Sequence, residues 1–296
     1  MPASLRNALF TTLGFIGWSW GFRLVAVSIV TYFLSRSGAS FQEVSDSVAA
    51  NEITIYGVAA FVFFLIWLNF LPVSRSGRVD LWSPHRLWKQ GWLGWIEGAA
   101  TSALLALGLL IFGVYLYQGF FIQTEEWWIA FGILIVKALA ILSWGYVEEL
   151  LFRGRLLPQA ILWLGEPIAL AMVTALSVVW KWYQFPLGWM SLGTLTLFYL
   201  ALGLRASHSR GSFERGAGVW CGLVMMLHLG LSLPILGHDA QGVFTLRYDW
   251  KWDATSSWVR LFSGGSGGPL SSFLLQCVLI ADILKSLLIR GVPSLK

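Results

Sequence analysis

The sequence predicts an all-helical membrane bundle of about eight transmembrane helices, organised as a single integral-membrane domain over residues 1–296. Of these 296 residues, 57% are hydrophobic and only 12% are charged, whereas a soluble domain carries about a quarter charged residues. The mean hydropathy of +0.69 agrees with this bias. The 18 tryptophans are typical of a chain with many membrane–water boundaries. These observations argue against a soluble enzyme and indicate a polytopic membrane protein.

Eight stretches are predicted as spanning helices, because a span needs about 20 mostly apolar residues. They lie at about Leu9–Leu34, Ile53–Val73, Trp92–Tyr117, Trp127–Phe152, Pro167–Trp182, Leu187–Leu204, Ala217–Leu236 and Leu270–Ile289. The first stretch is too long for the core of a signal peptide, so we expect it to be retained.

The basic residues predict the orientation of these spans. With eight spans, most lysines and arginines of the connecting segments fall on one side of the membrane. They are Arg6, Arg75, Arg78, Arg86, Lys89, Arg153, Arg155, Arg205, Arg210, Arg215, Arg290 and Lys296. The last loop on the opposite side departs from this bias with Arg247, Lys251 and Arg260. Since cytoplasmic loops are enriched in Lys and Arg, both termini are predicted to be cytoplasmic. The net charge of +5 is therefore attributed to topology and not to nucleic-acid binding.

Two segments are not expected to cross the membrane. Residues 74–92 ("SRSGRVDLWSPHRLWKQGW") combine Trp82 and Trp88 with cations, which is typical of an interfacial segment. Residues 262–270 ("FSGGSGGPL") are predicted to form a flexible or re-entrant glycine loop. This loop lacks the Lys-Ser/Thr ending of a phosphate-binding P-loop, so it predicts no nucleotide site.

Small residues and cysteines carry weaker signals. Gly17 and Gly21 form a small-xxx-small pair, which predicts close helix packing. Cys221 and Cys277 are isolated in apolar stretches, and their spacing indicates neither a disulfide framework nor a zinc site.

Ionisable residues within the predicted spans are functional candidates, because lipid cannot solvate them. They are Arg23, Glu97, Lys137, Glu148, Glu149, Arg153, Lys181, His228 and Lys285. We expect Arg23 and Lys285 to extend toward an interface along their apolar stems. Glu97 and Lys137 could instead form a structural pair between helices.

The stretch "VEELLFRGR" (147–155) places two carboxylates and two arginines at the end of the fourth predicted span. If it is helical, Glu149 and Arg153 stand at i and i+4 and can pair, while Glu148 points elsewhere. A desolvated carboxylate in that position is a candidate general base. The alternative is a solvated helix end with a salt bridge. His228 and Ser232, one helical turn apart, are predicted to share a face that could polarise a carbonyl or bind a metal.

These residues resemble motifs of the CPBP glutamic intramembrane endopeptidases, which include the type II CAAX prenyl proteases and the bacterial "CAAX protease self-immunity" proteins. "EELLFR" matches the family's Glu-Glu-x-x-x-Arg motif, "FRG" overlaps its end, and "HLGLS" stands where the family has His-x-x-x-Asn. The resemblance covers about Ala130–Leu236, the protease-type core. "GGSGGPLSSF" looks like the tail of photosynthetic bacterial members, which implies a bacterial plasma membrane or an internal photosynthetic membrane.

The resemblance implies peptide-bond hydrolysis within or beside the membrane, on a membrane-embedded or prenylated peptide. It implies that Glu148 activates water, that Glu149 and Arg153 form a structural pair, and that His228 assists. No cofactor is expected; zinc or another divalent metal is poorly supported, because one histidine and two glutamates make a poor zinc site.

The chain departs from the family pattern at two of its motifs. Where the family has Phe-x-x-x-His, this chain places Ser177 and Lys181. Ser232 replaces the asparagine of the third motif. A protonated lysine has no lone pair for a metal, and beside Glu148 it would weaken that carboxylate as a base. Lys181 could therefore form an inert buried pair, act as a neutral base, or turn outward.

Three functions follow from these alternatives. The first is an intramembrane endopeptidase. The second is a catalytically inactive homologue, a membrane scaffold or assembly factor that binds a membrane protein partner through its cavity and the loop Gly237–Pro269. The third is a transporter that uses its intramembrane Glu and Lys residues as a proton relay, although no internal repeat is visible. Membrane lipid is an expected partner in each case, and nucleic acid is not.

Overall fold

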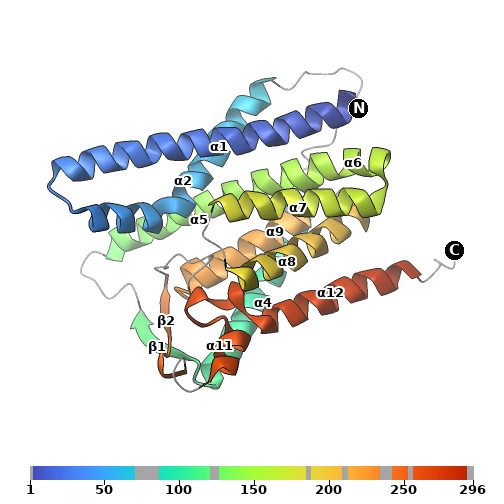
Figure 1. Cartoon of the computed structure of the whole chain (residues 1–296). Helices are drawn as coiled ribbons and strands as arrows, with labels where there is room; N and C mark the ends of the chain where they lie inside the picture. Colours follow the sequence, from blue (N-terminus) through green and yellow to red (C-terminus); the bar gives the residue numbers. More distant parts are fainter. Residues whose placement is uncertain are drawn as a thin grey trace.

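The computed structural model describes residues 3–70, 87–120, 127–184, 188–208, 213–233, 242–252 and 256–291, and most of these are helical. Figure 1 shows the helices packed side by side as a bundle. In chain order the main helices are α1 (Ala3–Arg36), α2 (Phe41–Phe70), α4 (Trp92–Ile111), α5 (Trp127–Glu149), α6 (Leu157–Leu164), α7 (Glu166–Gln184), α8 (Trp189–His208), α9 (Glu214–Val224), α11 (Ser257–Ser263) and α12 (Phe273–Gly291).

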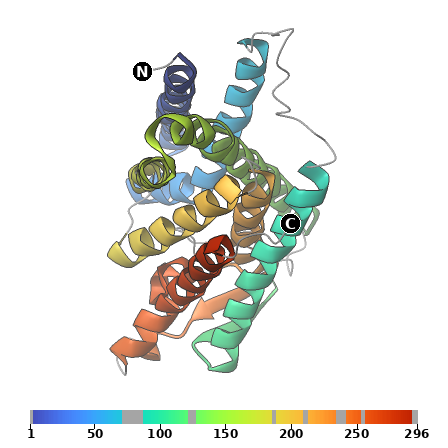
Figure 2. The same cartoon turned by 90° about the vertical axis from the view of Figure 1, so that its right-hand side faces the viewer.

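Several of these helices continue through turns of π- or 3-10-helix. The π-helical segments are η1 (Leu87–Gly91) before α4, η2 (Leu150–Leu156) between α5 and α6, and η3 (Met225–Gly230) after α9. The 3-10 turns η4 (Gly265–Gly267) and η5 (Pro269–Ser271) connect α11 to α12. In Figures 1 and 2, α12 lies beside α8, on the side of the bundle away from α1.

Among the described residues, four helical segments are long and apolar enough to cross a membrane: Ala3–Arg36, Phe41–Trp67, Trp88–Ile111 and Trp127–Leu164. The prediction of a mostly helical chain with membrane-spanning helices is confirmed to this extent. The last of these segments is α5 joined through η2 to α6, which continues about three turns past the predicted end at Phe152. The remaining four predicted spans coincide with the shorter helices α7, α8, α9 with η3, and α12.

The prediction of an all-helical fold is wrong in one place. Strands β1 (Tyr115–Phe120) and β2 (Phe244–Tyr248) form an antiparallel pair in which Tyr115 lies opposite Tyr248. The third predicted span was extended into β1, but α4 ends at Ile111 and Gly113 follows with φ +68°. A left-handed glycine after a helix stops it, and apolar content alone cannot distinguish a short strand from a helix end.

Close packing of α4 against α9 depends on four glycines. A Cβ at Gly94 or Gly98 of α4 would overlap backbone atoms of α9, and a Cβ at Gly218 or Gly222 of α9 would overlap backbone atoms of η1 and α4. Within each helix the two glycines are four residues apart, so they lie on one face. Apposed small residues let two backbones approach closely, which favours helix association in lipid.

The small residues of α1 do not have this role. A Cβ at Gly17 or Gly21 would meet no atom within 4 Å. The prediction that this pair marks helix packing is therefore wrong. The spacing places both glycines on one face of α1, but it does not specify which helix, if any, lies against that face.

Arg23 and Lys285, the two cations expected to extend toward an interface, differ in their surroundings. Arg23 of α1 lies 2.5 Å from Glu52 of α2, so it does not extend alone toward an interface as predicted. The ion pair holds the two antiparallel helices of the first hairpin together. Lys285 of α12 is exposed on the outer surface, as expected for a side chain that extends toward an interface.

Glu97 pairs with arginines and not with Lys137, which corrects the predicted Glu97–Lys137 pair. Its carboxylate lies 2.6 Å from Arg205 of α8 and 3.0 Å from Arg215 of α9. Arg205 also lies 2.8 Å from Asp282 of α12. These contacts connect four helices at one end of the bundle, at residues that the sequence places near the predicted cytoplasmic side.

The segments predicted not to cross the membrane are only partly described. Of residues 74–92, the part before Leu87 lies outside the described residues, as do Arg210, Lys296 and residues 237–241 of the loop Gly237–Pro269. The glycine loop at 262–270 forms a tight turn in which Pro269 and Leu270 are buried. Ser271, which follows it, lies 2.6 Å from Ser191 of α8, hydroxyl to hydroxyl. The turn therefore packs against the bundle.

Candidate functional site

A cluster of four buried charges lies where α5, η2, α7 and α8 meet. Glu148 and Glu149 are the last two residues of α5, Arg153 lies in η2, and Lys181 lies in α7. Each of the four is at most 1% exposed. The structure thus brings together four of the six residues predicted for the site, two of each charge.

Lys181 forms an ion pair with Glu148. Its ammonium nitrogen lies 2.5 Å from Oε2 of the carboxylate. It also lies over the Trp144 ring, 3.6 Å from the centroid, and 5.2 Å from the centroid of Trp220. Aromatic faces attract a cation, so the two indole rings stabilise the ammonium that pairs with Glu148. Of the three alternatives for Lys181, the structure shows the buried pair.

Tyr199 of α8 forms a hydrogen bond with the second oxygen of the Glu148 carboxylate. Its hydroxyl donates a hydrogen bond of 3.1 Å to Oε1 of Glu148. Its ring lies under the guanidinium of Arg153, 4.5 Å from centroid to Cζ. Tyr199 therefore contacts both charge pairs of the cluster, and sequence reasoning missed it. The available signal was a tyrosine in an apolar helix, because a buried tyrosine hydroxyl usually has a hydrogen-bond partner.

The predicted pairing of Glu149 with Arg153 is confirmed. Nη1 of Arg153 lies 2.9 Å from Oε1 of Glu149, four residues earlier, and both side chains are buried. The helix changes to π-helical geometry directly after Glu149. The segment that carries His228 is also π-helical. Short π-helical segments are rare and occur frequently at functional sites.

His228 and Ser232 do not share a helix face. His228 is buried in η3, which ends at Gly230, and Ser232 lies beyond it with φ +50°. The Ser232 hydroxyl accepts a hydrogen bond of 2.6 Å from the backbone N–H of Gly242. The prediction of a shared face is therefore wrong, because the helix ends before it completes the next turn. Ser232 instead fixes the backbone of a turn.

The second-motif position Ser177 also has a structural role. It is buried in α7, and its hydroxyl donates to the carbonyl oxygen of Val173 in the same helix, at 2.9 Å. The hydrogen-bonding partners of Glu148 in the described part of the chain are Lys181 and Tyr199, so His228 does not hold this carboxylate.

The chemistry of the cluster follows from these contacts. A general base needs a lone pair directed at the proton that it removes. One oxygen of Glu148 contacts the Lys181 ammonium, the other accepts a hydrogen bond from Tyr199, and the residue is only 1% exposed, so bulk solvent does not reach the carboxylate. Among the described residues, no group of three or more His, Cys, Asp or Glu side chains is placed to hold a metal ion. The geometry is that of a buried structural core in which two ion pairs, Glu148–Lys181 and Glu149–Arg153, balance each other's charges.

In the part of the chain that the structure describes, the fold and the cluster together define a mostly helical protein with four helices able to span a membrane and a buried charged core. Comparison of the chain with protein-family models finds no match, and comparisons with curated proteins and with solved structures find none either. The resemblance to the CPBP family therefore rests on the sequence motifs alone.

Proposed function

We propose that this chain is a catalytically inactive CPBP-type membrane protein that acts as a scaffold or assembly factor for membrane partners. The observation that carries the proposal is the 2.5 Å ion pair between Lys181 and Glu148, at the position where the family motif has a histidine. Both side chains are at most 1% exposed, so water does not compete for the carboxylate. The residue proposed to activate water is instead held as a structural anion.

Three features support the family part of the proposal. Glu149 and Arg153 pair as the motif requires. The eight predicted spans each coincide with a helix, although only four of them meet the length and hydropathy expected of a span. The bias of basic residues toward one set of loops favours eight crossings with both termini in the cytoplasm.

An active endopeptidase is the less favoured alternative. It would require Lys181 to leave Glu148, which would place one unpaired charge in a dry environment. Such a step costs several kcal/mol, because a buried ion that loses its partner keeps its desolvation penalty. A proton-coupled transporter meets the same difficulty, since its relay would have to titrate the same pair.

The test compares the natural chain with the double variant Glu148→Gln/Lys181→Met. This variant removes both charges, while the glutamine still accepts a hydrogen bond from Tyr199. We expect both proteins, reconstituted in lipid nanodiscs, to leave prenylated peptides and transmembrane-helix substrates uncleaved to the same degree. We also expect the double variant to restore function to cells that lack the chain, because a scaffold needs the fold and not the carboxylate.

Mass spectrometry of the products measures the first outcome, and complementation at matched protein levels measures the second. Lys285→Met is the control for loss of a lysine, because Lys285 lies exposed on α12. A product formed by the natural chain and lost in the double variant would establish a protease. Loss of complementation by a double variant that accumulates normally would also exclude the scaffold.

A further inference from the structure

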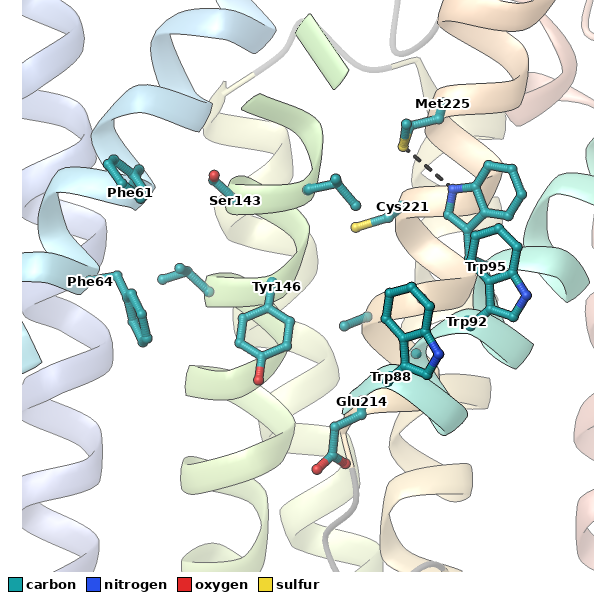
Figure 3. A pocket seen from close by; sticks show the side chains of 15 residues that line it. Phe61, Phe64, Trp88, Trp92, Trp95, Ser143, Tyr146, Glu214, Cys221 and Met225 are labelled. Carbon is teal, nitrogen blue, oxygen red and sulfur yellow. Dashed lines mark hydrogen bonds between the residues drawn. The ribbon is translucent and has the colours of Figure 1, made fainter. Parts of the chain in front are cut away.

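A second feature of the molecule is an apolar pocket of about 770 Å³, lined by residues of α2, α5, α9, η1, the start of α4 and the start of η3. Figure 3 shows Phe61 and Phe64 on one side and the rings of Trp88, Trp92 and Trp95 on the other. Trp92 is stacked on both of its tryptophan neighbours, with centroid separations of 6.4 Å to Trp88 and 5.1 Å to Trp95. The pocket is separate from the charged cluster in its lining and its chemistry.

The size of the pocket restricts what can occupy it. The pocket has a volume of about 770 Å³. It lies within the range of about 300–1,000 Å³ that is typical of small-ligand sites. An apolar chain fits both the volume and the lining.

The pocket has one polar end. Figure 3 places the hydroxyl of Tyr146 and the carboxylate of Glu214 at the same end, close to Trp88. Glu214 is buried, and it is the one charged side chain among the described residues of the lining. A carboxylate offers about four acceptor positions, so Glu214 can accept hydrogen bonds from a ligand alongside those from the protein.

The pocket runs from the predicted membrane interface into the hydrocarbon region, as one chain of a lipid does. Trp88 begins one of the helical segments able to span a membrane and is 77% exposed, as expected for a tryptophan at an interface. From Glu214, the lining follows α9 through Cys221 to Met225. The 11 residue steps from Glu214 to Met225 rise about 16 Å, which is about half of the ~30 Å hydrocarbon core and therefore one leaflet deep.

We propose that this pocket binds one hydrocarbon chain of a membrane lipid whose head group donates hydrogen bonds to Glu214. Ammonium and hydroxyl head groups share this donor chemistry. The head group lies at the interface with Glu214 and Tyr146, and the chain runs along the tryptophan wall toward Met225. The site extends the proposed function, and its failure would leave the charged-cluster argument unchanged.

The experiment is native mass spectrometry of the purified full chain, exchanged into mixed micelles with lipids of identical acyl chains. Phosphatidylethanolamine carries N–H donors, and phosphatidylcholine is its methylated counterpart without them. A neutral glycosyl diacylglycerol supplies hydroxyl donors. We expect one retained lipid per chain and a preference of about tenfold for phosphatidylethanolamine over phosphatidylcholine, since hydrogen bonds to charged groups carry about this much discrimination. Retention of the glycosyl lipid as well would show that hydroxyl donors suffice.

Two variants locate the site. Ser143→Trp places a large ring in the pocket from α5 and should reduce bound lipid about tenfold, whereas Leu139→Trp, one turn earlier and 59% exposed, should retain it. Glu214→Gln should bring the preference between the two phospholipids close to one. Size-exclusion profiles check that each variant remains folded. Equal retention of all three lipids by the natural chain, or unchanged retention in the folded Ser143→Trp protein, would overturn the proposal.

Discussion

Lys181→Met should lower the free energy of unfolding by about 3–5 kcal/mol, because it leaves the Glu148 carboxylate buried without its cation. The double variant Glu148→Gln/Lys181→Met should lose far less, since replacing both members of a buried ion pair by neutral residues of similar size is often close to neutral. The expected coupling is therefore large. The two charges are in direct contact at 2.5 Å, and neither side chain is more than 1% exposed.

A double-mutant cycle measures this coupling. The natural chain, the two single variants and the double variant are unfolded in mixed micelles with increasing denaturant, and the coupling energy is obtained from the four free energies. Lys285→Met again serves as the control for an exposed lysine and should change stability by less than about 0.5 kcal/mol. Additive effects of the two single substitutions would contradict a structural ion pair and would return Glu148 to the list of candidate bases.

Gly98→Ala should destabilise the protein by about 1–3 kcal/mol, which is the usual cost of an added methyl group in a tightly packed interface. The new Cβ would overlap the carbonyl oxygen of Val219 and approach the backbone nitrogen of Leu223 at 2.8 Å. Both are backbone atoms of α9, so no rotamer change relieves the contact. The helices must separate, and the loss of close packing weakens their association.

Gly17→Ala is the matched control. It is the same substitution in a glycine pair of the same spacing, with Gly21, but its Cβ would meet no atom within 4 Å. It should leave the free energy of unfolding unchanged or raise it by up to about 1 kcal/mol, because alanine is the better helix former. Thermal unfolding of the two variants in the same detergent distinguishes them. Equal stability of both would contradict the importance of the α4–α9 glycine contacts.

Much of the local structure could be predicted from the sequence. The helices were placed with shifts of a few residues at most boundaries, with larger errors at the start of α2 and the end of the segment through α6. The pairing of Glu149 with Arg153 also follows from spacing, since residues four apart in a helix are neighbours. Hydropathy and i,i+4 contacts depend only on residues close together in the sequence, so they can be predicted without knowledge of the tertiary structure.

The wrong and missing predictions depend on where a helix ends and which helix lies beside it, and the order of residues along the chain does not specify these. Gly17 and Gly21 have the same spacing as Gly94 and Gly98, yet only the second pair faces a helix at close range. Tyr199 has only the general signal of a tyrosine in an apolar helix, and it contacts Glu148, which lies 51 residues away in the sequence. Ser232 was placed on a helix face because the apolar run continues past Gly230, where the helix has already ended.

The sequence by itself determined that this protein is mostly helical, apolar and charged at a few intramembrane positions, because composition and periodicity are local properties of the chain. It offered three alternatives for Lys181 and could not choose among them. Only the tertiary structure decided that Lys181 meets Glu148, 33 residues earlier, and that Tyr199 completes the contact from α8. The physical reason is that a buried charge is stabilised by partners from other helices, and the packing of whole helices decides which partners those are.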